Sequence, residues 1–342
     1  MNKNHHSICM RDEVTALLSG GGNIQLIGEL DKDYKSSFRC ENAVSIALTN
    51  YKIAVLRQDG TVFTEWYQDY YMEFYDAETD SFRDVYHTDD WCNITKLCAG
   101  DDHIVGLTSG GRVYATGNND KGQCNVSGWK NIVDIATGCD TTLGLRADGT
   151  VVVTGDDQFD ICSARMWKNI KRIFAGPYDA IGIKYDGTIV STDEDWEQEL
   201  KGWTDIENIV ACIDTVVGVK SSGKILAICD DENFKEKLEQ WTNIIDVAIE
   251  DDLSDHYAVG LRSNGKMVSL GSGFWDDTLL GDKRIHIDGK ENIKTPDGTK
   301  ARDDKSDYAF SSSNTSGFKV EDIFYGLVWI GIVIYCFVKC SG

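Results

Sequence analysis

Residues 141–155 read TTLGLRADGTVVVTG, and they contain two β-rich runs separated by Asp148 and Gly149. Two such runs joined by Asp-Gly predict a β-hairpin, because a tight primed turn needs positive φ and this dipeptide tolerates it. Just upstream, WKNIVDIA (129–136) places apolar residues on one face of a short strand. The region therefore predicts one three-stranded antiparallel unit.

The same unit recurs along the chain. Five tryptophans, at positions 91, 129, 167, 203 and 241, are separated by 38, 38, 36 and 38 residues, and each opens W-x-N-I or the close variant WTDI. The predicted turns follow the same period, with glycines at Gly22, Gly60, Gly111, Gly149, Gly187, Gly223 and Gly265. Counted from Gly22 there are seven units, and a fixed period of this length indicates a repeat architecture.

The repeats predict an all-β fold, a seven-bladed β-propeller with three-stranded blades over residues 1–290. A single such sheet cannot bury its own faces, whereas a closed ring of seven can. A unit of about 38 residues leaves no room for a helix. An open β-solenoid is the alternative, but it would normally have a shorter period and a capping segment. Either HSICM (6–10) or RIHID (284–288) could close the ring, and the sequence leaves both open.

The units resemble those of the regulator of chromosome condensation repeat family. Residues 94–123, ITKLCAGDDHIVGLTSGGRVYATGNNDKGQ, carry its Ile-rich strand, Ala-Gly, histidine, apolar run and N-x-x-G-Q turn. The short period and the count of seven are most similar to the bacterial members with three-stranded blades, such as the β-lactamase inhibitor propeller. The family histidine is kept at His103, whereas other units have Thr141, Asp179, Thr215 or Tyr257. The resemblance implies the fold and leaves function open, because the family includes exchange factors and inhibitors.

Composition limits the classes of partner and the compartment. The 342 residues carry a net charge of −22, which argues against binding nucleic acid or an anionic membrane through a basic face. The eleven cysteines are odd in number, scattered and free of CxxC pairs, and the N-terminus has no apolar run of signal-peptide length. These features predict a cytoplasmic protein.

The sequence predicts no enzyme, cofactor or metal site. The standard phosphate-binding, zinc-protease, serine-hydrolase and dinucleotide motifs do not occur in it. His5, His6 and Cys9 have a spacing that could bind a metal, but a mobile terminus is the better interpretation. His103 is expected to be a hydrogen-bonded blade residue rather than a general base. The recurrent tryptophans are expected to pack between blades, with a ring of exposed aromatics as the alternative.

The best candidate for a binding site is an insertion between units two and three. The interval there is 51 residues instead of 38, and residues 65–90 combine many acids with aromatic side chains. Aromatic residues dominate protein interfaces, and surrounding acids would favour a basic partner. The candidate protein-binding residues are Trp66, Tyr67, Tyr70, Tyr71, Phe74 and Tyr75. An extended hairpin that packs on its own blade is an equal alternative. The acidic loops 156–160, 193–199 and 230–236 are expected to crowd one rim of the disc.

The C-terminal part differs in character. Residues 291–322 are polar and predict a solvated linker, and residues 323–340 form a hydrophobic segment. Ile323–Val338 are sixteen residues without a charge, closed by Lys339. They predict a transmembrane anchor, with a buried strand or an unassigned tail as alternatives.

Together these features favour a non-enzymatic scaffold for protein–protein interaction, cytoplasmic and tethered to a membrane if the tail inserts. Two alternatives follow from the resemblance. One is a guanine-nucleotide exchange factor for a small GTPase, and the other is a proteinaceous inhibitor of an enzyme.

Overall fold

The computed structural model describes residues 7–11, 14–19, 21–28, 37–67, 75–76, 81–82, 85–252 and 255–271. All of these belong to one compact unit, Met1–Glu291. The segments RIHID, 291–322 and Ile323–Val338, together with Tyr70, Tyr71 and Phe74, lie outside the described residues.

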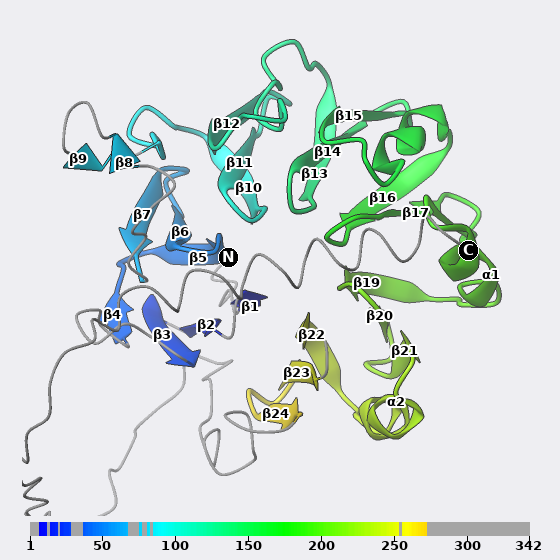
Figure 1. Ribbon diagram of the computed structural model, residues 1–342. Coiled ribbons are helices and arrows are strands. Elements are labelled where there is room, and N and C mark those ends of the chain that lie inside the picture. The colour runs from blue at the N-terminus through cyan, green and yellow to red at the C-terminus, as the bar shows by residue number, and fades with distance from the viewer. Residues whose placement is uncertain are drawn as a thin grey trace, which may run out of the picture. The chain divides into compact units, whose positions relative to one another are not determined.

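Seven antiparallel sheets follow one another along the chain and radiate from a common axis (Figure 1). Each is a simple meander, so the predicted seven-bladed propeller is confirmed. Six blades have three strands, as predicted, and blade 1 has a fourth, β4 (Ser37–Arg39), which pairs with β3 (Asn23–Gly28). The strands, blade by blade, are β1 (Ser7–Arg11), β2 (Val14–Ser19) and β3 (Asn23–Gly28); β5 (Ala43–Leu48), β6 (Lys52–Arg57) and β7 (Val62–Trp66); β10 (Ile94–Ala99), β11 (His103–Thr108) and β12 (Val113–Gly117); β13 (Ile132–Thr137), β14 (Thr141–Arg146) and β15 (Val151–Gly155); β16 (Ile170–Ala175), β17 (Ala180–Lys184) and β18 (Ile189–Ser191); β19 (Ile206–Ala211), β20 (Thr215–Lys220) and β21 (Ile225–Cys229); β22 (Ile244–Asp252), β23 (Asp255–Arg262) and β24 (Met267–Leu270).

The N-terminal strand closes the ring. β1 pairs with β2 in blade 1, and it also contacts the inner strands β5 and β22 of the two flanking blades. The backbone N–H of Ile8 donates to Oδ2 of Asp246 in β22 at 3.2 Å. Ile8 itself is buried against Leu17 of its own blade and Val259 of blade 7. Of the two closing segments that the sequence left open, HSICM therefore performs this role.

The W-x-N-I motif has a backbone explanation. Its asparagine adopts left-handed φ near +60° at Asn93, Asn131, Asn169 and Asn243, and Asp205 does the same in the WTDI variant. Asn42, at the equivalent position of blade 2, shares this angle although no tryptophan precedes it. Asparagine and aspartate tolerate this conformation better than other residues with a side chain. Immediately afterwards, six inner strands start with a register shift, for example between Ile132 and Asp134. Val133 lies at this bulge, which explains why it is an exposed apolar residue.

The tryptophans pack between blades, as predicted. Each indole lies over a glycine in the middle strand of its own blade, and it also joins the apolar cluster of the preceding blade. A methyl group placed on any of these glycines would lie 2.5–2.9 Å from the ring. The pairs are Trp91 with Gly106, Trp129 with Gly144, Trp167 with Gly182, Trp203 with Gly218 and Trp241 with Gly260.

The hairpin turns form where predicted, but not as primed turns. In blade 4 only Gly149 has positive φ, at +79°, and Asp148 does not. The N–H of Gly149 donates to the carbonyl of Arg146, and the Asp148 carboxylate accepts from the N–H and hydroxyl of Thr150. This geometry is a type I turn with a left-handed glycine, which is the common three-residue-loop form.

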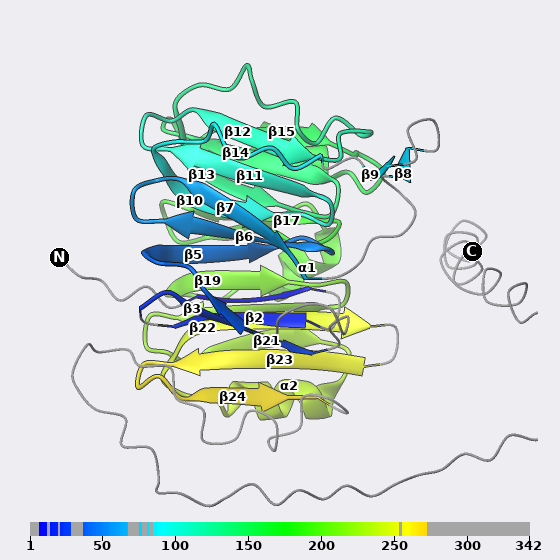
Figure 2. The same ribbon diagram turned by 90° about the vertical axis from the view of Figure 1, so that its left-hand side faces the viewer.

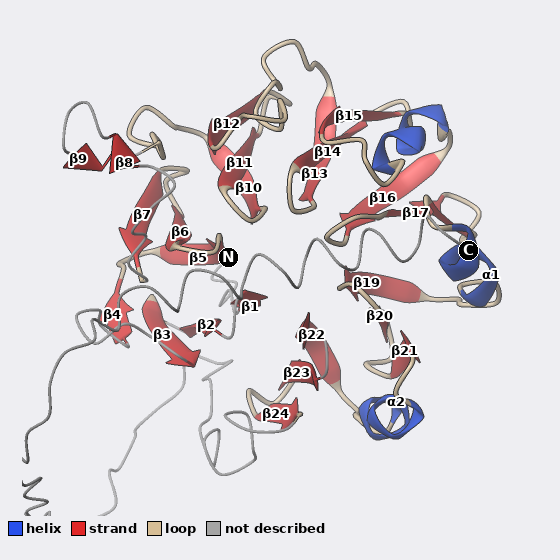
Figure 3. Cartoon of the chain, viewed as in Figure 1, coloured by secondary structure: helices blue, strands red, loops and turns tan. Residues whose placement is uncertain are grey.

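The prediction that a unit has no room for a helix was wrong. The loops after three outer strands contain a 3₁₀ helix, Ile161–Met166, and the helices α1 (Glu194–Glu199) and α2 (Glu232–Glu239), drawn blue in Figure 3. Aspartates of the acidic loops start both α-helices. Asp193 accepts from Trp196 N, and Asp231 accepts from Asn233 N and Phe234 N. Side-chain oxygens that satisfy the first free N–H groups favour a helix start at these positions.

Candidate functional site

The two faces of the disc differ in their connections. We call the face with the inner-to-middle loops, for example 49–51, 100–102, 138–140, 176–179 and 212–214, the loop face. The outer strands also end at this face, because all neighbouring strands are antiparallel and run across the thickness of the disc (Figure 2). The opposite side has the tight glycine turns and the tryptophans, and we call it the turn face.

A series of backbone hydrogen bonds links neighbouring loops around the axis on the loop face. Asn50 N donates to Asp101 O at 2.8 Å, Asp101 N to Cys139 O at 3.2 Å, and Cys139 N to Pro177 O at 3.2 Å. The next donor in this series would be residue 177, and proline has no N–H. Blades 2 to 5 are therefore joined through equivalent loop atoms, and the series ends at blade 5.

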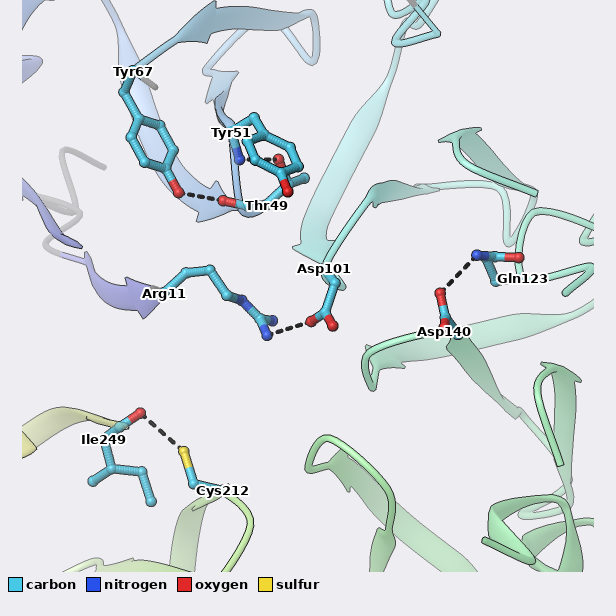
Figure 4. Close-up of polar contacts among 9 residues, drawn as sticks. All are labelled: Arg11, Thr49, Tyr51, Tyr67, Asp101, Gln123, Asp140, Cys212 and Ile249. Carbon is cyan, nitrogen blue, oxygen red and sulfur yellow. Dashed lines mark hydrogen bonds and ion pairs between the residues drawn. The ribbon is translucent and has the colours of Figure 1, made fainter. Parts of the chain in front are cut away.

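An ion pair crosses the centre of the loop face. Nη1 of Arg11, at the end of β1, lies 2.6 Å from Oδ1 of Asp101 in blade 3 (Figure 4). Burial lowers the pKa of Arg11, but nearby Asp101, Cys139 and Glu250 raise it more strongly, so the guanidinium stays charged. The pair thus ties the ring-closing strand of blade 1 to the loop series at blade 3.

Acids from successive blades gather on the loop face. Burial, followed by Asp101 and Asp156, raises the pKa of Asp140, and burial with Asp193 raises the pKa of Asp179 to about 7. Three cations near these acids are paired: Arg11 with Asp101, Lys121 with Asp156 at 3.2 Å, and Lys235 with Glu232 at 3.0 Å. The acidic loops 156–160, 193–199 and 230–236 follow outer strands that end at this face.

Exposed apolar side chains lie among these acids. Phe159, in the loop after β15, and Tyr178, in the loop after β16, pack against each other with ring centroids 4.4 Å apart and the rings tilted by 38°. Phe159 is 50% exposed. Ile213, in the blade 6 loop equivalent to that of Tyr178, is 45% exposed. Apolar groups surrounded by polar ones are typical of interaction surfaces. The sequence pattern did not predict these three residues, although Tyr178 and Ile213 occupy the same loop position in neighbouring units.

His103 is a structural residue, as expected. Its Nε2 lies 2.9 Å from Oγ1 of Thr142 in blade 4. The Thr142 hydroxyl donates to the carbonyl of Gln123, so it must accept from His103, and Nε2 carries the proton. Gln123 in turn donates to Asp140 at 2.9 Å. Burial lowers the pKa of His103 to about 4, which keeps the ring neutral in this link between blades 3 and 4.

The aromatic residues that the sequence predicted as a binding site in the insertion lie in different environments. Tyr67 is fully buried, and its hydroxyl donates to the carbonyl of Thr49. Its ring therefore stabilises the start of the insertion and offers no surface to a partner. Trp66 is half-buried in β7, where Lys52 Nζ lies 4.3 Å from the ring centroid and Tyr86 packs edge-on at 6.1 Å. Tyr75 lies in β8 (Tyr75–Asp76), which pairs with β9 (Ser81–Phe82) as a short hairpin.

Two further observations concern ligands and membranes. Within the described ranges, no three His, Cys, Asp or Glu residues are grouped so as to hold a metal ion. None of the helices in that part of the chain is long and apolar enough to cross a membrane.

Comparison with known proteins identifies a family that one of the repeats matches. Residues 94–123 match the family model of the regulator of chromosome condensation (RCC1) repeat. This segment includes His103 and Gln123, which form the link between blades 3 and 4. No curated protein sequence matches the chain.

Several solved structures are similar in fold. The ectodomain of the CRINKLY receptor kinase ACR4 from Arabidopsis thaliana has a TM-score of 0.54 and 15% identity, over 79% of this chain and 96% of that one. The ectodomain of the receptor kinase CR4 from Physcomitrella patens has a TM-score of 0.56 and 18% identity, over 79% and 73%. Yeast RCC1 (Prp20), solved with Kap60, has a TM-score of 0.50 and 16% identity, over 71% and 73%.

The fold and its repeated blades define a seven-bladed β-propeller. More specifically, one of its repeats, residues 94–123, matches the RCC1 repeat, and its fold is similar to that of the yeast RCC1 propeller.

Proposed function

We propose that this protein is a non-enzymatic propeller whose loop face binds a partner protein with a basic surface. The observation that carries the proposal is the exposure of Phe159, Tyr178 and Ile213 on a face that also carries the acidic loops. Apolar anchors provide contact area, and the surrounding charge selects the sign of the partner and speeds its encounter. Yeast RCC1, a similar propeller, was solved in a complex with the protein Kap60, which supports a role in protein binding.

A labelled peptide rich in lysine and leucine tests the proposal against the full chain. We expect binding that weakens steeply between low and physiological salt, because exposed charges are screened. Replacing Phe159 and Ile213 by serine should weaken binding severalfold, since the apolar anchors are lost. The matched control is Met166→Ser with Tyr185→Ser, two exposed apolar residues near the turn face. Equal loss in both pairs would reject the loop face as the site.

Charge on the loop face has its own test. Glu194→Gln with Asp195→Asn removes two exposed acids from α1, and Asp89→Asn with Asp90→Asn removes two exposed acids beside Trp91 on the turn face. The proposal requires that only the first pair reduces peptide affinity and its salt dependence. Binding that is insensitive to both pairs would contradict it.

The exchange-factor and inhibitor hypotheses stay predictions, because none of the described contacts bears on a GTPase or on an inhibited enzyme. Cytoplasmic location and anchoring through Ile323–Val338 are likewise proposals. Fractionation of the full chain beside a chain ending at residue 320 tests the anchor, and equal solubility of the two would reject it.

A further inference from the structure

Blade 2 lacks the tryptophan–glycine packing that blades 3 to 7 share. A tryptophan stands two residues before the left-handed Asn or Asp in blades 3 to 7, whereas Cys40 stands at this position before Asn42. The middle-strand glycine is also replaced, by the fully buried Val55. The junction between blades 1 and 2 therefore lacks the indole that fills each of the next five junctions.

A groove of about 750 Å³ lies at this junction. Its apolar lining comes from both blades and consists of Leu26, Phe38, Cys40, Phe63 and Trp66. Phe38 and Phe63 meet edge to face with centroids 6.4 Å apart. The volume is in the range of sites that hold a small ligand or a few residues of a peptide. Because the lining is aromatic and the missing group is an indole, the groove fits an aromatic side chain.

Two guanidinium groups add charge to this groove. Arg57 lies over the Phe63 ring at 5.2 Å and donates from Nε to the Cys40 sulfur at 3.4 Å. Arg39 donates from Nε to the carbonyl of Gly21 at 3.3 Å. Neither forms an ion pair with a described residue. Arginine pairs readily with carboxylates, so an aromatic ligand with a carboxylate beside it matches the lining.

The exposed acids Glu41 and Glu65 also line the groove. They disfavour a ligand with several negative charges, because like charges brought together repel. The chemistry thus selects a single carboxylate next to an aromatic ring rather than a polyanion.

We propose that the groove between blades 1 and 2 is a second binding site, which takes a tryptophan side chain of a partner peptide with one adjoining carboxylate. This site is separate from the surface around Phe159, Tyr178 and Ile213 and does not depend on the function proposed for that surface. The indole occupies the place that Trp91 and its equivalents fill elsewhere in the ring, and Arg57 with Arg39 binds the carboxylate.

The test uses the dipeptide acetyl-5-fluorotryptophan-aspartate amide, followed by ¹⁹F NMR on the full chain. We expect saturable line broadening, and affinity about tenfold lower for the matching asparagine dipeptide, because a charge-assisted hydrogen bond is lost. Absence of binding by either dipeptide at millimolar concentration would overturn the proposal.

Two variants locate the site. Cys40→Trp with Val55→Gly restores the tryptophan–glycine pair, so it should abolish binding without lowering the melting temperature. Cys92→Trp, at an exposed position outside the groove, is the matched control and should bind as the native chain does. Arg57→Met should bind the aspartate and asparagine dipeptides equally, which checks the arginine's role if the first variant is unstable. Native-like binding by Cys40→Trp with Val55→Gly would disprove the site.

Discussion

Asn169 shows how one residue type supports the repeat. It adopts φ +61° between Trp167 and the bulge of β16, and its carbonyl accepts from the N–H of Tyr185. The W-x-N-I motif is visible in the sequence, but the sequence does not show that its asparagine is needed because the backbone has positive φ at that position. The W-x-N-I pattern could equally have arisen from side-chain hydrogen bonds, and only the backbone angles distinguish the two explanations.

Replacing Asn169 therefore tests the backbone explanation. Asn169→Ala should lower the free energy of unfolding by about 1 to 2 kcal/mol, because alanine is strained at positive φ. Asn169→Gly should be close to neutral, since glycine adopts this angle freely. Urea denaturation of the two variants beside the native chain measures the difference. Equal losses would mean that the amide side chain matters rather than the backbone angle.

Asp246 makes stability depend on pH. Burial raises its carboxyl pKa from 3.8 to about 7, against the opposing effect of the Ile8 and Val247 N–H groups. A pKa raised by folding contributes stability below the unfolded value, and this contribution is lost as pH rises towards 7. Asp246→Asn stays neutral throughout, so it should gain melting temperature relative to the native chain on going from pH 5 to pH 8.

The control for this prediction is an aspartate with the opposite shift. The hydroxyl and N–H of Thr61 lower the pKa of the exposed Asp59, which is ionised in both states above pH 5. Asp59→Asn should therefore show the same offset in melting temperature at pH 5 and pH 8. A similar pH response in both variants would rule out the burial of Asp246 as the cause.

At the level of elements, strands were predictable and helices were not. Apolar alternation and Asp-Gly turns recur at a fixed interval, so each hairpin signal is repeated several times. The helices α1 and α2 occur once each and are short, and their strongest signals, Asp193 and Asp231, are hidden in acidic runs that are also typical of solvated loops. For the loop face, the sequence predicted the acidic loops but not the exposed apolar residues. The exposure of Phe159 and Ile213 depends on which neighbouring residues cover each loop, and the sequence does not show this.

The tryptophan–glycine contact is the element-level feature most open to test. Gly144→Ala places a methyl group against the Trp129 ring, so we expect a loss of about 1 to 3 kcal/mol in the free energy of unfolding. Gly128→Ala is the matched control, because a methyl group added at Gly128 would have no atom within 4 Å. In a Trp129→Leu background Gly144→Ala should cost much less. Additive effects of the two changes would show that the ring and the glycine do not interact.

For the whole molecule, the seven units predicted a closed ring, but the closing segment could not be chosen from sequence. HSICM and RIHID have similar apolar character, and the choice depends on long-range contacts such as that between Ile8 and Asp246. Ile8→Ala should lower the free energy of unfolding by about 2 to 5 kcal/mol, as expected for a buried side chain truncated in a core. Hydrogen exchange should accelerate first in β22 and β23. Uniform acceleration across all blades would contradict a local role at the closure.

The end of the loop series at Pro177 has a mechanical consequence. The same loop-to-loop bond joins the three successive junctions from blade 2 to blade 5, and at the next junction Pro177 has no N–H to continue it. Thermal opening of the disc should accordingly occur at the junction of blades 5 and 6 before it occurs at those three junctions. Because Ile213 lies at the junction of blades 5 and 6, a partner that binds there would contact both blades and make the whole ring more rigid.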